Sequence, residues 1–270
     1  MTGKSGFQLR QGGPEVYERC WVRAQLAQSA EELVAAANVS SGDRVIDIAC
    51  GTGVVARSAA VRSGDAATVT GADVNSDMLA AAARFAADAD LADIAWVECD
   101  AADIPEQDSK FDVALCQQGL QFMPDKKGAL AEMWRVLKPG GRLAITVWKT
   151  RSPIGAAFAN VFDRHFGEGT AAPWEMVYSL GDRARLRKLA SGAGFRNTHI
   201  TFDVKFARHP DPAAFISGAI AGSPMAEVIA GLSDADHDRL IREILAELSL
   251  YHDDDGLAVP AECLTLTALK

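Results

Sequence analysis

A glycine-rich turn beside an acidic residue is the strongest sign of chemistry in this sequence. Residues 47–53 read Asp-Ile-Ala-Cys-Gly-Thr-Gly and follow a short apolar run. Glycines let the main chain approach a ligand closely, because no β-carbon intervenes. The helix expected after the turn presents unpaired N–H groups toward the same space. The segment therefore predicts a ligand site with contacts from Asp47, Gly51, Thr52 and Gly53.

Two further acids narrow the chemistry of that ligand. Asp73 ends the second apolar run, where a carboxylate can accept hydrogen bonds from both hydroxyls of an unphosphorylated ribose. Asp100 and Ala101 follow the third run, where a short acid and a small residue can meet the edge of an adenine. Three carboxylates around one pocket suit a cationic sulfonium nucleoside better than a dianionic pyrophosphate. The turn alone leaves a nicotinamide dinucleotide open, because residues 51–56 also satisfy G-x-G-x-x-A.

Short apolar runs alternate with helical ones between residues 44 and 148, and this alternation predicts an α/β core. Strand-like runs rich in Val, Ile and Ala lie at 44–48, 68–73, 94–98, 111–116 and 141–148. Helical spacing fills 54–63, 76–89 and 125–137, and Ser76 is the predicted N-cap of the second helix. Repeated strand–helix units imply a Rossmann-like, doubly wound, mostly parallel sheet with helices on both faces.

Helical segments lie on both sides of this core. We assign residues 1–40 to an N-terminal helical segment covering the cofactor, 41–150 to the Rossmann-like core, and 151–270 to a C-terminal part that completes the sheet. In that part, helices are expected at 154–166 and 182–193 and strands at 198–206 and 264–268. Residues 211–250 are mostly helical and carry apolar residues at helical spacing. We expect them to pack on the core as a lid, with a subunit contact as the second interpretation.

Composition excludes several other classes of function. The 270 residues are 49% hydrophobic, enough for a sizeable core, and the net charge of −9 disfavours a nucleic-acid partner. No run of about 18 apolar residues and no signal peptide is present, so we expect no membrane span. The five cysteines are odd in number and lack zinc-site spacing, which predicts reduced core thiols, no metal and a cytoplasmic protein.

The order of these segments resembles the class I S-adenosylmethionine-dependent methyltransferases. Among them it is similar to the branch that includes the ubiquinone/menaquinone-biosynthesis C-methyltransferases. Beside the glycine turn, the matching motifs are Gly-Ala-Asp-Val-Asn at 71–75, Gln-Gln-Gly-Leu-Gln-Phe at 117–122, and the run 132–141 that ends in Pro-Gly-Gly. The resemblance covers residues 44–148. It implies S-adenosylmethionine as cofactor and a seven-stranded sheet with an antiparallel last strand.

By position, the resemblance also assigns each part of the cofactor to residues of these motifs. Gly51 and Gly53 would contact the methionine moiety, and Asp73 the ribose hydroxyls. The adenine would lie between two apolar side chains and a short acidic edge, namely Val74, Met78, Asp100 and Ala101. The ammonium and carboxylate groups would meet residues after the fourth strand and one aromatic side chain of the N-terminal helix, namely Gln117, Gln121, Phe122 and Tyr17.

Methyl transfer requires in-line approach of a nucleophile, so positioning and exclusion of water dominate the chemistry. A carbon or oxygen acceptor also needs a base, whereas a thiol or a neutral amine does not. No base stands out, and the weak candidates for a catalytic group are Tyr17, His165 and Gln121. The acceptor pocket should draw on residues outside the shared motifs, chiefly aromatic ones: Trp21, Gln118, Trp148, Trp174 and Tyr178.

The sequence therefore predicts an S-adenosylmethionine-dependent methyltransferase acting on a small or medium-sized molecule, as a monomer or a homodimer. Carbon, oxygen, sulfur and nitrogen acceptors all remain open. Two other readings also remain: a non-catalytic protein that binds S-adenosylmethionine, and an NAD-dependent oxidoreductase. A thermal shift with S-adenosylhomocysteine but not with NAD would exclude the oxidoreductase.

Overall fold

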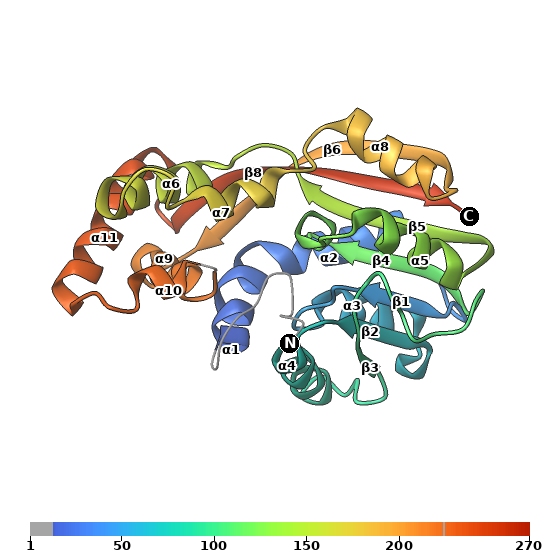
Figure 1. Cartoon of the computed structure of the whole chain (residues 1–270). Coiled ribbons are helices and arrows are strands. Elements are labelled where there is room, and N and C mark those ends of the chain that lie inside the picture. Colours follow the sequence, from blue (N-terminus) through green and yellow to red (C-terminus); the bar gives the residue numbers. More distant parts are fainter. Residues whose placement is uncertain (1–12, 224) are drawn as a thin grey trace.

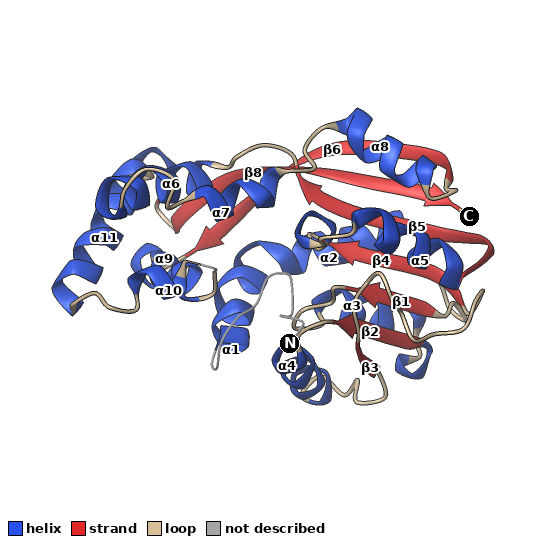
Figure 2. Cartoon of the chain, in the orientation of Figure 1, coloured by secondary structure: helices blue, strands red, loops and turns tan. Residues whose placement is uncertain are grey.

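The computed structural model describes residues 13–223 and 225–270, and its central feature is one mixed sheet (Figures 1 and 2). The strands are β1 (Val45–Ile48), β2 (Val69–Asp73), β3 (Ala95–Glu98), β4 (Phe111–Gln117), β5 (Leu137–Trp148), β6 (Arg196–His209), β7 (His252–Asp253) and β8 (Gly256–Leu269). Their order is β3-β2-β1-β4-β5-β8-β6, with the two-residue β7 paired to β8. Strands β1 to β5 pair in parallel, and β8 runs antiparallel to β5 and β6. The predicted Rossmann-like sheet with an antiparallel last strand is confirmed.

Helices cover both faces of this sheet. On one face lie α2 (Ala27–Ala36), α3 (Val54–Ser63) and α4 (Ser76–Ala87), and on the other α5 (Lys126–Val136) and α8 (Arg183–Gly192) (Figure 1). Neighbouring strand residues serve opposite faces: Val113 and Leu115 pack with α2 and α3, whereas Ala114 and Cys116 pack with α5. Since successive side chains alternate between two buried faces, the central strands are continuous apolar runs.

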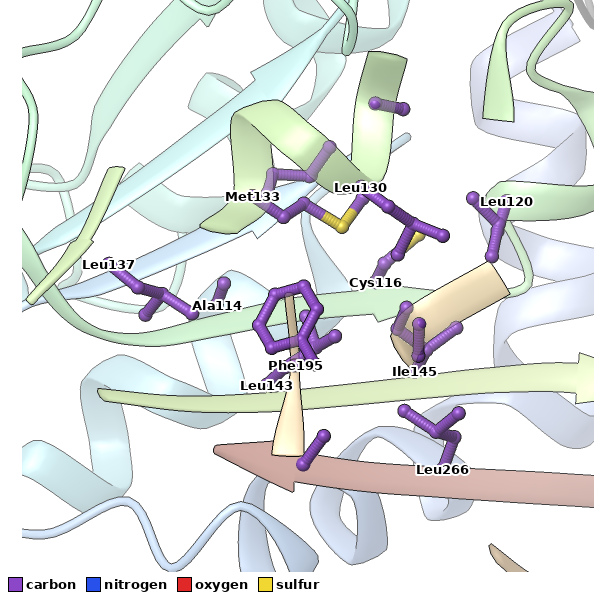
Figure 3. Close-up of a cluster of buried hydrophobic side chains, with 14 of the residues drawn as sticks. Ala114, Cys116, Leu120, Leu130, Met133, Leu137, Leu143, Ile145, Phe195 and Leu266 are labelled. Carbon is purple, nitrogen blue, oxygen red and sulfur yellow. The ribbon is translucent and has the colours of Figure 1, made fainter. Parts of the chain in front are cut away.

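The core beneath α5 fixes the end of strand β4. Figure 3 shows Leu130 and Met133 of α5 over the strands that carry Cys116 and Ile145. Leu120, which follows β4 in the 3-10 turn η3 (Leu120–Phe122), is completely buried in the same cluster. The segment between β4 and η3 is therefore anchored at both ends.

The helix of the predicted N-terminal segment differs in form from an ordinary α-helix. It is continuous through α1 (Gly13–Tyr17), the π-helical segment η1 (Glu18–Leu26) and α2. A π-helix bonds each N–H to a carbonyl five residues earlier, so its turns are wider than those of an α-helix. As a result Tyr17, Trp21 and Leu26, spaced by four and five residues, face the same cavity. Residues 1–12 of the predicted N-terminal segment lie outside the described part of the chain.

A second lobe of helices surrounds the outer half of the long antiparallel strand pair β6–β8 (Figure 1). Its elements are α6 (Pro153–Phe166), α7 (Ala172–Glu175), η4 (Met176–Tyr178), α9 (Pro212–Ala221), α10 (Ala226–Ile229), α11 (Asp234–Glu247) and η5 (Ser249–Tyr251). Phe158, Phe215 and Leu240 are completely buried in a hydrophobic cluster of this lobe. The apolar residues of the predicted insertion thus pack largely within the chain's own helical lobe. The last strand, β8, is longer than predicted because it pairs with β6 along nearly its whole length.

Two local details complete the fold. The N-cap of α4 is Asn75, one residue earlier than predicted, because its side chain accepts hydrogen bonds from the main-chain nitrogens of Asp77 (2.9 Å) and Met78 (3.3 Å). A 3-10 turn, η2 (Ala66–Thr68), leads into β2. In the described part of the chain, no helix has both the length and the apolar character needed to cross a membrane.

Candidate active site

One cavity lies at the carboxyl ends of strands β1, β2 and β4 and continues toward the helical lobe. Ligands of open α/β sheets bind at this edge, where the strand order reverses between β1 and β4. The N-terminal helix forms one wall, and α6, η4 and β8 contribute at the other end. The cavity brings together most of the residues predicted from sequence: Tyr17, Trp21, Gly51, Asp73, Val74, Met78, Asp100, Ala101, Gln117, Gln118, Phe122, Trp148, Trp174 and Tyr178.

Asp73 is held in place by two main-chain donors. Its Oδ2 accepts a hydrogen bond from the nitrogen of Gly51 (2.8 Å), and its Oδ1 accepts one from the nitrogen of Asn75 (2.9 Å). Burial raises the pKa of this carboxyl, and the main-chain hydrogen bonds oppose that rise. Each carboxylate oxygen keeps a further lone pair for a ligand hydroxyl. Asp73 is therefore oriented before any ligand binds.

The two glycines of the turn have different structural roles. Both have left-handed backbone conformations, with φ of +53° at Gly51 and +81° at Gly53. A β-carbon at Gly51 would meet no atom within 4 Å, and this residue lines the cavity. A β-carbon at Gly53 would lie 2.5 Å from Cη2 of Trp96 on β3. Gly53 does not line the cavity, so its lack of a side chain serves the turn and the packing of Trp96 rather than a ligand contact.

Asp47 and Thr52 stand behind the cavity instead of lining it. Asp47 is 1% exposed, and its Oδ2 accepts a hydrogen bond from the nitrogen of Ala56 (3.0 Å), which ties β1 to the first turn of α3. Burial raises the pKa of Asp47 well above its usual value, and the charge of Asp73 adds to the rise. Thr52 donates its hydroxyl hydrogen to Oε2 of Glu18 (2.5 Å) in the N-terminal helix.

Glu18 connects the N-terminal helix to the glycine turn. Besides accepting from Thr52, it pairs through Oε1 with the guanidinium of Arg57 on α3 (2.5 Å). Arg57 in turn donates to the main-chain oxygen of Thr52 (2.5 Å). This three-residue contact holds the wall that carries Tyr17 and Trp21 against the turn. The sequence analysis missed it, because Glu18 lies 34 residues from Thr52 along the chain.

The end of the cavity nearest β2 and β3 has an apolar surface with an acidic rim. Val74 and the buried Met78 line it, and Asp100 is exposed at the edge, where its Oδ1 accepts a hydrogen bond from the nitrogen of Ala102 (2.9 Å). Cys99 lies beside them, and burial with nearby acids raises the pKa of its thiol to about 11. An apolar slot with hydrogen-bond acceptors at its edge suits a heteroaromatic ring that carries an amino group.

The segment after β4 closes the middle of the cavity. Gln117 donates from Nε2 to the main-chain oxygen of Leu26 (3.1 Å), joining the strand end to the N-terminal helix. Gln118 has a left-handed backbone (φ +52°), and its Oε1 accepts a hydrogen bond from Nε2 of Gln121 (3.0 Å). Gln121 is completely buried and does not line the cavity. Its contribution is therefore to orient Gln118.

A family model described as a methyltransferase domain matches residues 45–141. These residues span β1 to the start of β5 and include the turn, Asp73 and the segment after β4. Residues 45–141 are thus similar to methyltransferase domains. The match favours S-adenosylmethionine, the cofactor that the resemblance implies, over the dinucleotide that the glycine turn left open. It therefore weighs against the oxidoreductase reading.

Curated relatives of this methyltransferase domain agree with the match. The chain is 43% identical over 157 residues to the ubiquinone/menaquinone biosynthesis C-methyltransferase UbiE of Paraburkholderia phytofirmans, covering 57% of this chain and 64% of that protein. It is 37% identical over 133 residues to UbiE of Xylella fastidiosa, covering 49% of this chain and 52% of that protein. The chain thus matches only part of the length of these relatives.

A solved structure extends the likeness in fold over nearly the whole chain. Phosphoethanolamine N-methyltransferase 2 of Haemonchus contortus, in complex with phosphomonomethylethanolamine and S-adenosylhomocysteine, matches with a TM-score of 0.62 at 20% identity. The match covers 96% of this chain and 57% of that one. At this identity the likeness concerns the fold alone. The part of the cavity outside the matched domain must therefore be interpreted from this chain's own residues.

The far end of the cavity is built by residues outside the matched domain. Trp21 donates from Nε1 to the main-chain oxygen of Ala219 on α9 (3.4 Å), and Trp148 ends β5. Trp174 of α7 is 8% exposed, and the Tyr178 hydroxyl oxygen lies 3.2 Å from Oγ of Ser152, the N-cap of α6. The sequence analysis missed Ser152, although Ser-Pro before a helical run is a signal for an N-cap. It also missed Gln25, which lines the cavity between Trp21 and Leu26.

The structure gives His165 no place in this site. Its Nε2 lies 3.0 Å from Oε2 of Glu243 on α11, and the residue does not line the cavity. Its position reflects contacts between α6 and α11, which a sequence pattern does not reveal. Tyr17 does line the cavity, but burial and the nearby acids Glu18 and Asp73 raise its pKa above the usual range. Its hydroxyl therefore stays protonated and serves as a hydrogen-bond donor rather than a base.

Proposed function

We propose that this chain transfers the methyl group of S-adenosylmethionine to a small or medium-sized acceptor held at the far end of the same cavity. The single observation that carries the proposal is the continuity of the cavity. It runs from Asp73 and Gly51, in the methyltransferase domain, to Trp174 and Tyr178 in the helical lobe. A donor and an acceptor bound in one cavity can meet without water between them, which direct transfer requires.

In this proposal the cofactor occupies the end of the cavity nearest the sheet. The open space beside Gly51 takes the methionine moiety, and both oxygens of Asp73 accept hydrogen bonds from the ribose hydroxyls. The adenine lies in the slot of Val74 and Met78, with its edge toward Asp100 and Ala101. The ammonium and carboxylate groups lie near the aromatic and polar residues Tyr17, Gln25, Gln117 and Phe122. Asp47, Thr52, Gly53 and Gln121 act one layer behind, by positioning the residues that make contact.

The protein's contribution to the chemistry is then orientation and exclusion of water. The acidic residues Asp73 and Asp100 favour a cationic sulfonium at the cofactor end. Among the described residues that line the cavity there is no His, Lys, Arg or Glu, and the two acids, Asp73 and Asp100, lie at the cofactor end, so no carboxylate, imidazole or amine side chain stands beside the acceptor as a general base. We infer that the acceptor arrives with a nucleophile that needs no strong base, or deprotonated. From the predicted insertion, Gly222 and Ser223, which follow α9, line the cavity.

We also propose that the acceptor is a small molecule rather than a nucleic acid. The net charge of −9 opposes a phosphate backbone, and the acidic and apolar lining of the cavity offers no basic side chain to a phosphate. All five cysteines are free thiols, which supports a reducing compartment such as the cytoplasm. Since the apolar residues of α9 and α11 are buried within the chain's own lobe, we favour a monomer over a dimer formed through them.

The proposal is tested by transfer of label from S-adenosyl-[methyl-¹⁴C]methionine. The full chain is incubated with a panel of phenols, thiols, amines and enolisable ketones, and label in the extracted product is counted. We expect S-adenosylhomocysteine to accumulate in proportion to a labelled acceptor, and the Asp73→Asn variant to lose this signal. Binding of S-adenosylhomocysteine without transfer to any acceptor class would contradict the proposal and favour a non-catalytic binding protein.

A further inference from the structure

We propose that Tyr178 and Ser152 form a hydrogen-bond-donating site for an uncharged oxygen of the acceptor, and so determine which acceptors the cavity takes. This inference rests on the proposed function, because it assigns the acceptor end of the same cavity. It concerns residues of the helical lobe, outside the matched domain of residues 45–141. Three observations carry it: the charge of the lining, the hydrogen bonds at the start of α6, and an unpartnered indole nitrogen.

The charged groups of the cavity are confined to the cofactor end. Among the described residues that line it, the charged side chains are those of Asp73 and Asp100, which follow or end strands of the sheet. The opposite end is lined by apolar and aromatic side chains, including Trp148, Trp174 and Val259. A charged acceptor group there would lose its hydration without gaining a counter-charge, which is costly. The acceptor end therefore favours an uncharged group.

A pair of hydroxyls breaks this apolar surface at the N-terminus of α6. The nitrogen of Gly155 donates to Oγ of Ser152 (3.2 Å), and Ser152 Oγ lies 3.2 Å from the hydroxyl oxygen of Tyr178. Both Ser152 and Tyr178 line the cavity. The two hydroxyls carry two hydrogens, but the contact between them uses only one. Whichever oxygen is the donor, one hydroxyl hydrogen is left for a ligand.

The surroundings of Tyr178 keep its hydroxyl group protonated. Burial raises the pKa of Tyr178, and hydrogen bonds from the side chain and main chain of Ser152 only partly oppose the rise, so the hydroxyl stays protonated at neutral pH. With Ser152 as the donor of the side-chain contact, both bonds supply hydrogens to the Tyr178 oxygen, which then directs its own hydrogen elsewhere. A chain of bonds that starts at the N–H of Gly155 polarises each later member and strengthens the final donor. The pair is thus a better donor than an isolated tyrosine.

Close approach of Tyr178 to α6 requires a glycine. A β-carbon at residue 155 would collide with the Tyr178 hydroxyl oxygen, whereas hydrogen at this position lets the ring lie over the first turn of the helix. Gly155 lies within the first turn of α6, where Ala would be the better helix former. The glycine therefore serves the position of Tyr178 rather than the stability of the helix.

The indole N–H of Trp174 is a second, independent sign that the cavity takes a hydrogen-bond acceptor. Its side chain lines the cavity and is 8% exposed, yet its Nε1 has no hydrogen-bond partner in the described structure. Buried indole N–H groups usually find an acceptor, because an unpaired buried donor destabilises the protein. An acceptor molecule with an oxygen within reach of Nε1 would provide one. Both donors thus call for a hydrogen-bond-accepting ligand atom.

The test uses four probes of nearly the same shape: acetophenone, α-methylstyrene, benzylammonium and benzoate. They are titrated into the S-adenosylhomocysteine complex of the full chain by ligand-observed NMR. We expect acetophenone to bind about three- to tenfold more tightly than α-methylstyrene, the gain of one neutral hydrogen bond. The two ions should bind more weakly than acetophenone. Equal affinity of acetophenone and α-methylstyrene, or tightest binding of benzylammonium in an aromatic cage, would overturn the proposal.

Variants test which residues produce the preference for acetophenone over α-methylstyrene. Tyr178→Phe should reduce it, and Tyr178→Phe combined with Ser152→Ala should remove it, while Tyr251→Phe, which deletes a hydroxyl outside the cavity, should leave it intact. Unchanged affinity for S-adenosylhomocysteine shows that each variant is folded. A preference that survives the double variant would contradict the assignment. If the preference holds but no acceptor is ever methylated, methyl transfer fails as the function while the donor site stands.

Discussion

The main-chain nitrogen of Gly51 donates a hydrogen bond to Oδ2 of Asp73 over 2.8 Å. This bond links the glycine turn after β1 to the acid that ends β2, two features separated by 22 residues in the sequence. It aligns one carboxylate oxygen with the turn, while the nitrogen of Asn75 holds the other. The two motifs that indicate a nucleoside cofactor are therefore one rigid unit, and several consequences can be measured.

Alanine at the two glycines should separate a stability effect from a binding effect. Gly53→Ala combines a left-handed backbone with a collision against Trp96, so we expect it to lower the free energy of unfolding by about 2–4 kcal/mol. Gly51→Ala carries the backbone cost alone, about 1–2 kcal/mol, but places a methyl group beside the cavity. Urea denaturation and calorimetry with S-adenosylhomocysteine measure the two effects. Equal destabilisation by both variants would contradict the role given to Trp96.

Glu18 should control how long the cofactor stays bound. Glu18→Gln weakens the contacts with Thr52 and Arg57, both in a partly buried setting, and should speed dissociation of S-adenosylhomocysteine by about tenfold. Glu15→Gln is the matched control on the same helix, because the pair of Glu15 with Arg84 is exposed and worth little. Stopped-flow displacement measures the rates. If the control changes the rate as much as Glu18→Gln, the N-terminal helix is not fastened through Glu18.

Asp47 should leave a signature in the pH dependence of stability. Burial raises its pKa well above that of an unfolded aspartate, so in the window above about pH 4 the folded chain binds more protons than the unfolded chain. The Asp47 contribution to stability therefore grows as the pH falls through this window. The difference in unfolding free energy between wild type and Asp47→Asn should shift in favour of wild type from about pH 8 to about pH 5. A pH-independent difference in urea titrations would contradict this.

His165 should be dispensable for methyl transfer. It contacts Glu243 in the helical lobe and does not reach the cavity, so His165→Gln should leave the transfer rate within about twofold of wild type. The assay uses whichever acceptor the labelled panel identifies. A loss of about a hundredfold or more, with the fold intact, would restore His165 as a catalytic base.

Much of the cofactor end could be predicted from sequence, because local rules govern it. The acid at the end of β2 and the glycine at the turn follow from strand periodicity and backbone geometry, and both line the cavity as expected. The function of Gly53 could not be predicted, since it depends on Trp96, a residue of another strand. The same holds for Asp47, whose neighbours are set by the start of α3.

The acceptor end was less predictable because its residues meet only through long-range packing. Trp174 and Tyr178 were expected there as aromatic residues outside the core, and both line the cavity. Ser152 was missed, since its role comes from a contact with Tyr178, 26 residues away. His165 was a candidate catalytic group from sequence, but its side chain contacts Glu243 on α11 and does not line the cavity. The π-helical form of the N-terminal helix also has no simple sequence signal, because propensity scales describe the α-helix.

The most direct test of the central claim is calorimetry of S-adenosylhomocysteine binding to wild type, Asp73→Asn and Asp77→Asn. Asp77 is an exposed acid on α4 and serves as the matched control. The account predicts that Asp73→Asn weakens binding by about 1.5–3 kcal/mol, the value of hydrogen bonds to a charged group, with little change for Asp77→Asn. Binding by Asp73→Asn as tight as by wild type would contradict the assignment of this cavity to S-adenosylmethionine.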